Sequence, residues 1–156
     1  MLEARHKMKL FYPYRPWENE PDSAAWETDL GYKCRIKRNE ITGTLCGYVG
    51  IPKEHRLWGL EYADDSQVKF LLRLDLDKIS EEVHGGLTYS GEEDADGYWY
   101  LGFDTAHADD FSPAIVEMLL GQGRKDIGFF KASDYKTWEF VENEVYLLSK
   151  LLEQYR

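Results

Sequence analysis

Two segments in the first third of the chain alternate apolar and polar residues with the two-residue period of a β-strand. They cover residues 32–38 and 44–50, and the stretch Asn39–Gly43 between them has the composition of a turn. The pattern therefore predicts an antiparallel hairpin. Centring its turn on Glu40 places Cys34 and Cys46 opposite each other on one face.

Three later segments carry the same strand signal. Residues 68–76 alternate apolar with mostly polar side chains, and residues 83–90 and 98–105 predict two more strands. The acidic stretch Gly91–Gly97 between the last two has the composition of a solvated loop. The sequence thus predicts an antiparallel sheet of about five strands.

The remainder of the chain has the period of helices. A short helix is expected to begin at Ser112 and to stop in a left-handed residue at Gly121. A long helix is expected to begin near Ser133 or Asp134 and to run toward Arg156. Its apolar residues are spaced alternately by three and four positions: Trp138, Val141, Val145, Leu148, Leu152 and Tyr155. We expect this stripe to cover one face of the sheet, and a homodimer through this helix is the alternative.

These elements predict one α+β domain over residues 32–156, in which the sheet is covered by the long C-terminal helix and a short second helix. Residues 1–31 hold three of the five prolines and several aromatic residues without a regular period. This segment is therefore expected to be an extended aromatic and proline-rich arm, whose large side chains anchor it to the domain.

Composition excludes several classes of protein. The chain has 156 residues with a net charge of −10, so direct binding to nucleic acid is not expected. No apolar run is long enough to cross a membrane, and no secretory signal follows the basic residues near the start. These features predict a cytoplasmic protein. In that reducing compartment Cys34 and Cys46 are expected to be buried small hydrophobic residues, although a disulfide between them is geometrically conceivable.

The apolar alternation also fixes an expected register for the last two strands. With the connecting loop centred on Asp94, His84 lies opposite Asp104 on the polar side of the sheet. The same register makes a shallow polar floor, which leaves room for a ligand to approach the backbone. The residues expected to bind that ligand are Gly86, Thr88, Tyr100 and Gly102.

Further polar residues follow this floor where the last strand ends. His107 and Asp109 can join His84 and Asp104 there, with Asp110 as an alternative to Asp109. Two imidazoles with carboxylates are the ligand types of a zinc, manganese or iron site, where bound water can be activated for hydrolysis.

Two other interpretations of these residues stay open. Asp104 can orient His84 as a general base, or the histidines and carboxylates can make purely structural contacts and caps. No recognised catalytic or nucleotide-binding motif decides between them.

The segment Gly91–Asp110 contains seven Asp or Glu residues and no Lys or Arg. Such a run is typical of solvated surface, and it can also form a negative patch that meets a basic partner.

Three short motifs resemble a family of uncharacterised bacteriophage and prophage proteins. They are CGYVGIP at 46–52, VHGGLTY at 83–89 and GFDTAHAD at 102–109. The resemblance implies a small cytoplasmic protein of phage type that acts on host or phage components, and it implies no activity or catalytic residues. The expected function is that of an accessory protein that binds a host or phage protein or a small ligand. The alternative is a metal-dependent hydrolase with its metal at the His/Asp cluster.

Overall fold

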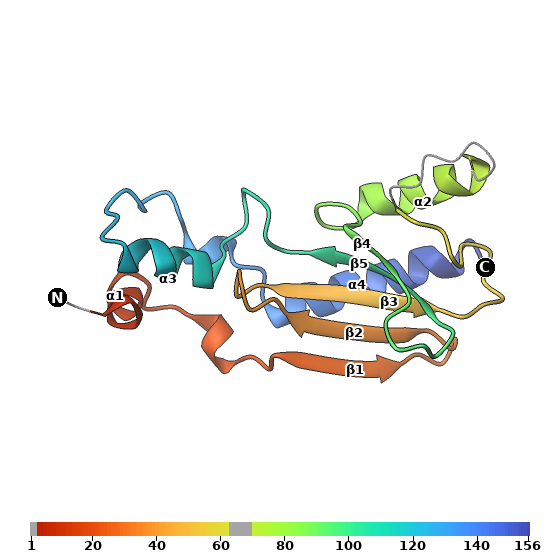
Figure 1. Ribbon diagram of the computed structural model, residues 1–156, viewed down its shortest axis with the longest axis horizontal. Helices are drawn as coiled ribbons and strands as arrows, with labels where there is room; N and C mark the ends of the chain where they lie inside the picture. Colours follow the sequence, from red (N-terminus) through yellow and green to blue (C-terminus); the bar gives the residue numbers. More distant parts are fainter. Residues whose placement is uncertain (1–2, 63–69) are drawn as a thin grey trace.

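A five-stranded antiparallel sheet runs along the molecule in the order β1-β2-β3-β5-β4 (Figure 1). The computed structural model describes residues 3–62 and 70–156. The strands are β1 (Ser23–Glu27), β2 (Lys33–Arg38), β3 (Leu45–Ile51), β4 (Tyr89–Gly91) and β5 (Trp99–Asp104). The predicted α+β class with an antiparallel sheet is confirmed.

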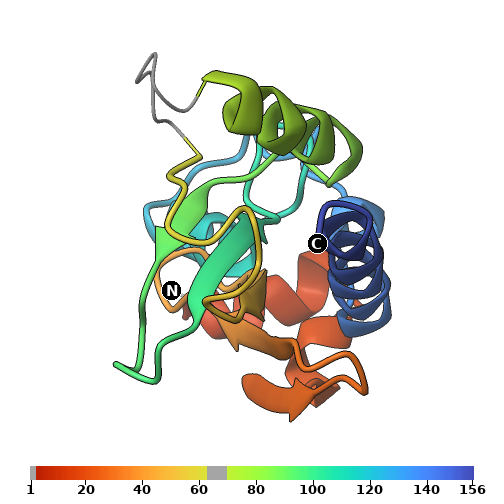
Figure 2. The same cartoon turned by 90° about the vertical axis from the view of Figure 1, so that its right-hand side faces the viewer.

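The helices lie around this sheet on one face and at its ends. They are α1 (Ala4–Phe11), α2 (Phe70–Glu82), α3 (Pro113–Gly121) and α4 (Trp138–Glu153), with short 3-10 turns at Pro16–Asn19 and Ala132–Asp134. Helix α4 packs along one sheet face (Figure 2), while α1 and α3 pair beyond one end of the sheet (Figure 1). Within the described ranges, none of these helices combines the length and the apolar character that a membrane crossing requires.

The predicted stripe of the C-terminal helix forms the main core. The Thr137 side chain caps α4 by accepting a hydrogen bond from the Phe140 N–H at 3.3 Å, so the helix begins at Trp138 rather than near Ser133. Four stripe residues are fully buried against the sheet: Val141, Val145, Leu148 and Leu152. At Gly47 of β3 an added Cβ would lie 2.7 Å from Val145 Cγ2, so the missing side chain allows α4 to approach the strand closely.

The prediction of an extended arm over residues 1–31 is wrong for much of that segment. It contains α1, a 3-10 turn and the edge strand β1, in which Trp26 pairs with Cys34 of β2. The five residues of β1 are too few for their alternation to stand out in a sequence. Aromatic side chains do anchor the segment, since Tyr12 is buried and Trp17 stacks on Phe111 with ring centroids 5.2 Å apart.

The strand predicted over 68–76 is also wrong. Residues 68 and 69 lie outside the described residues, and Phe70–Glu82 is the helix α2. The buried residues Leu76, Ile79 and Val83 are spaced by three and four, which is a helical stripe that the strand alternation concealed. The segment is rich in Leu, Lys, Arg and Glu, which favour helix over strand.

The predicted short helix is confirmed as α3, but its stop signal differs from the expectation. Gly121 is the last helical residue, and the left-handed conformation belongs to Gly123, whose φ is +76°.

The register predicted for the first hairpin is wrong by three positions. Its turn closes between Asn39 and Thr44, with the Asn39 N–H donating to the Thr44 carbonyl at 2.8 Å, so it is not centred on Glu40. Cys34 therefore pairs with Val49, and Cys46 pairs with Lys37. An odd shift places the two thiols on opposite faces of the sheet, where both are free and buried. Burial raises the pKa of the Cys34 thiol to about 11.

The register predicted for the last hairpin is wrong as well. Of the strand expected over 83–90 only the end is β-structure, because Val83 and His84 follow the end of α2. Tyr89 pairs with Gly102, so the strand alternation does not extend back to His84 and His84 does not face Asp104 across the sheet. The run of apolar residues before Tyr89 belongs to a helix end and a turn, whose period is not two.

The buried His55 gives the fold a dependence on pH. Its Nε2–H donates to the Leu152 carbonyl at 2.8 Å and its Nδ1 accepts from the Leu57 N–H at 3.0 Å, so the folded ring is neutral. Burial lowers the pKa of His55 below the ordinary 6.5. Below about pH 6.5 the unfolded chain gains a proton that the folded chain resists, so this contribution to stability is lost as pH falls.

We therefore expect His55→Gln to unfold at a lower temperature than the wild type at about pH 8, with the gap narrowing toward about pH 5. Thermal unfolding followed by circular dichroism across this range measures the gap. The control is His6→Gln, because His6 is exposed on α1. A gap for His55→Gln that stays constant with pH contradicts the assignment.

Candidate functional site

Two histidines and an aspartate from separate segments meet at one point beside the sheet. His84 follows the end of α2, and His107 and Asp110 lie in the loop between β5 and α3. One ligand atom from each of these three side chains lies within 4.8 Å of the others. We call His84, His107 and Asp110 the histidine cluster.

Asp110 is the centre of this cluster. Its Oδ2 accepts hydrogen bonds from His84 Nε2 at 3.0 Å, from His107 Nδ1 at 2.9 Å and from the His107 backbone N–H at 3.0 Å. Its Oδ1 lies 3.1 Å from the ammonium of Lys136. The carboxylate thus joins three segments of the chain: the end of α2, the β5–α3 loop and the residues before α4.

The charges around Asp110 keep it ionised although its side chain is fully buried. Burial by itself raises the pKa of this carboxyl, but the hydrogen bonds from His84, His107 and Lys136 outweigh it and the pKa lies below the usual range. A buried carboxylate held in this way presents a full negative charge to any cation placed beside it.

Two buried polar atoms beside the cluster lack a hydrogen-bond partner within the described residues. One is His107 Nε2, which faces Asp104 Oδ1 at 3.5 Å, and the other is Oε2 of Glu144 on α4. Burial raises the pKa of Glu144, and the nearby His84 opposes that shift. Unsatisfied buried polar atoms are rare in native proteins, so these two atoms single out the surroundings of the cluster as a candidate binding site.

A glycine turn makes room for His107. Gly85 has a φ of +67°, and a Cβ at this position would lie 2.0 Å from His107 Cε1. The turn itself is fixed by the Gly86 N–H donating to the Val83 carbonyl at 2.8 Å. The His-Gly-Gly sequence therefore follows the end of α2 and lets the His107 ring pack directly against the backbone of Gly85, where a side chain would clash.

The structure brings some of the predicted metal ligands together and separates others. His84 and His107 meet, and Asp110 is the carboxylate between them. Asp109 is exposed and lies outside the group of three. Asp104 approaches His107 rather than His84, so the predicted arrangement in which Asp104 orients His84 is replaced by the contact between Asp110 and His84.

The predicted polar floor does not form. Thr88 donates its N–H to the Gly102 carbonyl at 2.8 Å, and Tyr100 lies fully buried beneath the guanidinium of Arg35. A Cβ at Gly102 would lie 2.5 Å from the Tyr48 ring, and one at Gly86 would meet Ser80 at 3.1 Å. Tyr100, Gly102 and Gly86 therefore face neighbouring parts of the fold, whereas Thr88 uses its backbone N–H in the sheet and its side chain is exposed.

Sequence reasoning missed the contribution of the C-terminal segment. Lys136 bonds to Asp110, Phe140 meets His84 edge to face with ring centroids 5.2 Å apart, and Glu144 lies near His84. The spacing of four residues places Phe140 and Glu144 on one side of α4, and Lys136 lies just before the N-cap of this helix. Nothing in the sequence indicated that this side faces His84.

A cavity of about 400 Å³ adjoins the cluster. Asp110 and Lys136 form part of its wall, together with Lys131 and the adjacent rings of Phe129 and Phe130. A molecule bound there would contact the outer side of the cluster.

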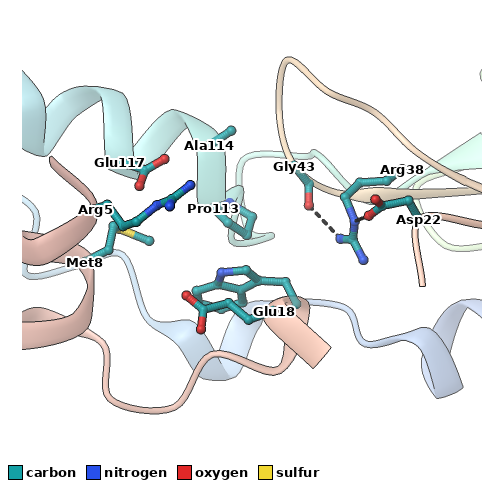
Figure 3. Close-up of a pocket in the computed structure, with 10 residues that line it drawn as sticks. Arg5, Met8, Glu18, Asp22, Arg38, Gly43, Pro113, Ala114 and Glu117 are labelled. Atoms are coloured by element: carbon teal, nitrogen blue, oxygen red, sulfur yellow. Dashed lines mark hydrogen bonds and ion pairs between the residues drawn. The ribbon is translucent and has the colours of Figure 1, made fainter. Parts of the chain in front are cut away.

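Figure 3 shows a second cavity, of about 260 Å³, between α1, α3 and the turn before β3. Arg38 donates there to the Gly43 carbonyl at 2.9 Å and to Asp22 at 2.8 Å, and it also bonds to Tyr135. The guanidinium is thus used to hold the turn and the N-terminal segment in place, and this cavity shares no lining residue with the first.

Comparisons with protein-family models, with curated proteins and with solved structures give no match to this chain.

We expect Gly85→Ala to displace His107 and to destabilise the fold by about 1–3 kcal/mol through overpacking, in addition to about 1–2 kcal/mol for the left-handed backbone. The matched control is Gly31→Ala, where φ is +86° and no atom lies within 4 Å of the added Cβ. Urea unfolding of both variants measures the difference. Equal losses of stability would show that His107 does not pack on Gly85.

Proposed function

We propose that this chain binds one divalent transition-metal ion through His84, His107 and Asp110. The observation that carries the proposal is the convergence of two imidazole nitrogens and a buried, ionised carboxylate within 4.8 Å. Neutral imidazole and carboxylate are the ligands that Zn²⁺ and similar ions prefer. The unsatisfied Oε2 of Glu144 near His84 adds support, because water bound to an ion can supply a partner for such an atom.

The spacing of the ligand atoms suits an ion with little rearrangement. His84 Nε2 and His107 Nδ1 lie 3.0 and 2.9 Å from Asp110 Oδ2. Neighbouring ligands of a tetrahedral ion with bonds of about 2.1 Å lie roughly 3.4 Å apart. The two distances to Oδ2 lie within about 0.5 Å of that spacing, and all three ligand atoms lie within 4.8 Å of one another, so an ion can replace the protons that the imidazoles now share with Asp110.

Lys136 places a positive charge next to the proposed metal site. Its ammonium lies 3.1 Å from Asp110 Oδ1, whereas His107 Nδ1 bonds to Oδ2 and His84 Nε2 lies 3.0 Å from both oxygens. A metal on Oδ2 therefore leaves the lysine contact in place as an outer support of the ligand. The two positive charges would repel each other, so Lys136 is expected to weaken the affinity for the metal.

Zinc titration of metal-free protein tests the site. We expect one Zn²⁺ per chain by calorimetry, and zinc at about 100 times its dissociation constant stabilises the fold by about 2.7 kcal/mol. For a chain of this length that raises the unfolding temperature by roughly 5–10 °C. Both effects are expected to disappear in Asp110→Asn and to remain in Asp109→Asn, its exposed neighbour.

Two further variants keep the test decisive if Asp110→Asn fails to fold. His84→Gln is expected to lose zinc, since it removes a half-buried ligand and keeps the size of the side chain similar. Lys136→Gln is expected to bind zinc more tightly than the wild type. If the cluster is purely structural, the same change is expected only to lower the stability of the fold. Zinc affinity that is the same in all variants, or absent from the wild type, contradicts the proposal.

A metal-dependent hydrolase is the second candidate, and the adjoining cavity favours it. The cavity has room for a substrate beside Asp110, and its charged lining is mixed, with Lys131 and Lys136 accompanied by Asp109 and Asp134. The two lysines are the groups that would contact the oxygens of a phosphoester next to the metal. Glu144 and Asp104 are the carboxylates nearest the cluster that could accept a proton from metal-bound water.

The hydrolase candidate predicts that the zinc-loaded protein cleaves bis(p-nitrophenyl) phosphate. Release of nitrophenol is expected to require zinc and to be lost in His84→Gln. Zinc binding without turnover in the wild type would restrict the site to a structural or storage role.

We also propose that the protein acts as a phage-type accessory protein that binds a host or phage protein. Phe129 supports this role, because 69% of its surface is exposed at the rim of the same cavity, where an aromatic side chain can anchor a partner. The role is compatible with a bound metal.

A further inference from the structure

The face of the sheet opposite α4 carries a row of positive charge. Lys33, Arg35 and Lys37 alternate along β2, so the pleat of the strand places all three on this face. Tyrosines from the neighbouring strands complete the surface. Tyr48 of β3 lies opposite Arg35, and Tyr100 of β5 lies beneath the Arg35 guanidinium, which is 4.5 Å from its ring centroid.

The tyrosine rings lie flat on this face because glycines oppose them. Gly102 pairs with Tyr48, and its added Cβ would lie 2.5 Å from the Tyr48 ring. Gly50 pairs with Tyr100, and its added Cβ would lie 2.7 Å from the Tyr100 ring. The Tyr48 ring is partly exposed, whereas the Tyr100 ring is fully buried beneath the Arg35 guanidinium, so the planar groups that this face presents are the Tyr48 ring and the Arg35 guanidinium. We call Lys33, Arg35, Lys37, Tyr48 and Tyr100 the basic tyrosine face.

An acidic segment of the chain covers this face. The loop of residues 92–98 turns back over β2 on the side of the sheet away from α4 (Figures 1 and 2). Asp96 pairs with Lys33 at 3.0 Å, and Glu93 lies 3.1 Å from Arg35 and 3.3 Å from Lys37. Asp94 also pairs with Arg35. With Asp104, which accepts from the Ala106 N–H, and Asp110 of the histidine cluster, five of the seven carboxylates in the segment predicted to be a solvated acidic patch are engaged within the chain.

The covering loop is held mainly by charge. Residues 92–96 read Glu-Glu-Asp-Ala-Asp and contribute no large apolar side chain to the core. Ala95 has a φ of +53°, which is unfavourable for a residue with a Cβ. Ion pairs between partly exposed side chains add little stability and are screened by salt, so an anionic ligand can compete with the loop.

We propose that the basic tyrosine face is a binding surface for single-stranded nucleic acid, which the acidic loop occupies as an internal competitor. Unpaired bases stack on aromatic rings such as Tyr48 and on guanidinium planes such as that of Arg35, and their phosphates bind to rows of cations. The loop places carboxylates on the cations that phosphates would contact. The net charge of −10 disfavours nucleic-acid binding by the whole molecule, and the loop carries three of the charges that oppose it at this face.

Removal of the loop charges tests the proposal. The variant Glu93→Gln/Asp94→Asn/Asp96→Asn changes the net charge from −10 to −7, since three carboxylates are neutralised. Fluorescence anisotropy with a labelled oligonucleotide of about 20 thymidines is expected to show binding about tenfold or more tighter than in the wild type. With three cations engaged, the slope of log affinity against log salt is expected to be about −2.

A matched variant separates the face from bulk charge. Glu81→Gln/Glu82→Gln/Glu139→Gln makes the same change in net charge at exposed positions on α2 and α4. It is expected to bind the oligonucleotide no better than the wild type. Adding Arg35→Gln to the loop variant is expected to abolish binding, and circular dichroism checks that each variant is folded.

Four outcomes would overturn the proposal. These are no binding by the folded loop variant, equal binding by the matched variant, equal binding of duplex DNA, and preference for polyglutamate over the oligonucleotide. The last result would identify the face as a site for acidic peptide.

Discussion

The packing of α4 on the central strand β3 is the contact on which the rest of the molecule depends. Val141, Val145, Leu148 and Leu152 are fully buried there, and Gly47 lets the helix lie close to the strand. Burying an aliphatic side chain of this kind contributes about 1.5–3 kcal/mol, so this face supplies a large part of the hydrophobic stabilisation. Once α4 is fixed, the direction of its N-terminal end is fixed too.

The histidine cluster follows from that placement. Lys136, Phe140 and Glu144 lie on the side of the C-terminal segment that faces His84, and Asp110 connects this side to the β5–α3 loop. The polar cluster therefore sits at the boundary between two cores, one under α4 and one around Phe111. A boundary position explains how an ionised carboxylate can be buried: each core supplies part of its cover, and the histidines and lysine replace water as its partners.

Much of the fold could be predicted from periodicity, because β2, α3 and α4 each carry a pattern set by one buried side, whereas β3 and β5 are buried on both faces and were identified by their strand-forming residues. The errors fall where a pattern fits two structures or is too short. Leu72 and Leu76 fit a strand as well as a helix, and only the later Ile79 and Val83 favour the helix.

The predicted strand registers were wrong because a small change in the position of a turn changes the partner of every residue in the hairpin. The turn between Asn39 and Thr44 does this for Cys34, which pairs with Val49. For the site, His84 and His107 were identified by residue type, but the choice of Asp110 and the part played by Lys136 depend on tertiary packing that a single sequence does not encode locally.

The strand order also constrains how the chain reaches this structure. β1, β2 and β3 are consecutive neighbours joined by short turns, whereas β3 pairs with β5 across the whole intervening segment 52–98. Closing a long loop costs more entropy than closing a turn, so the three-stranded meander is favoured as the early structure and β5 as the late addition. Until β5 joins, the edge of β3 and the apolar faces of Val49 and Ile51 stay open, and during that interval the chain is most exposed to pairing with another copy of itself.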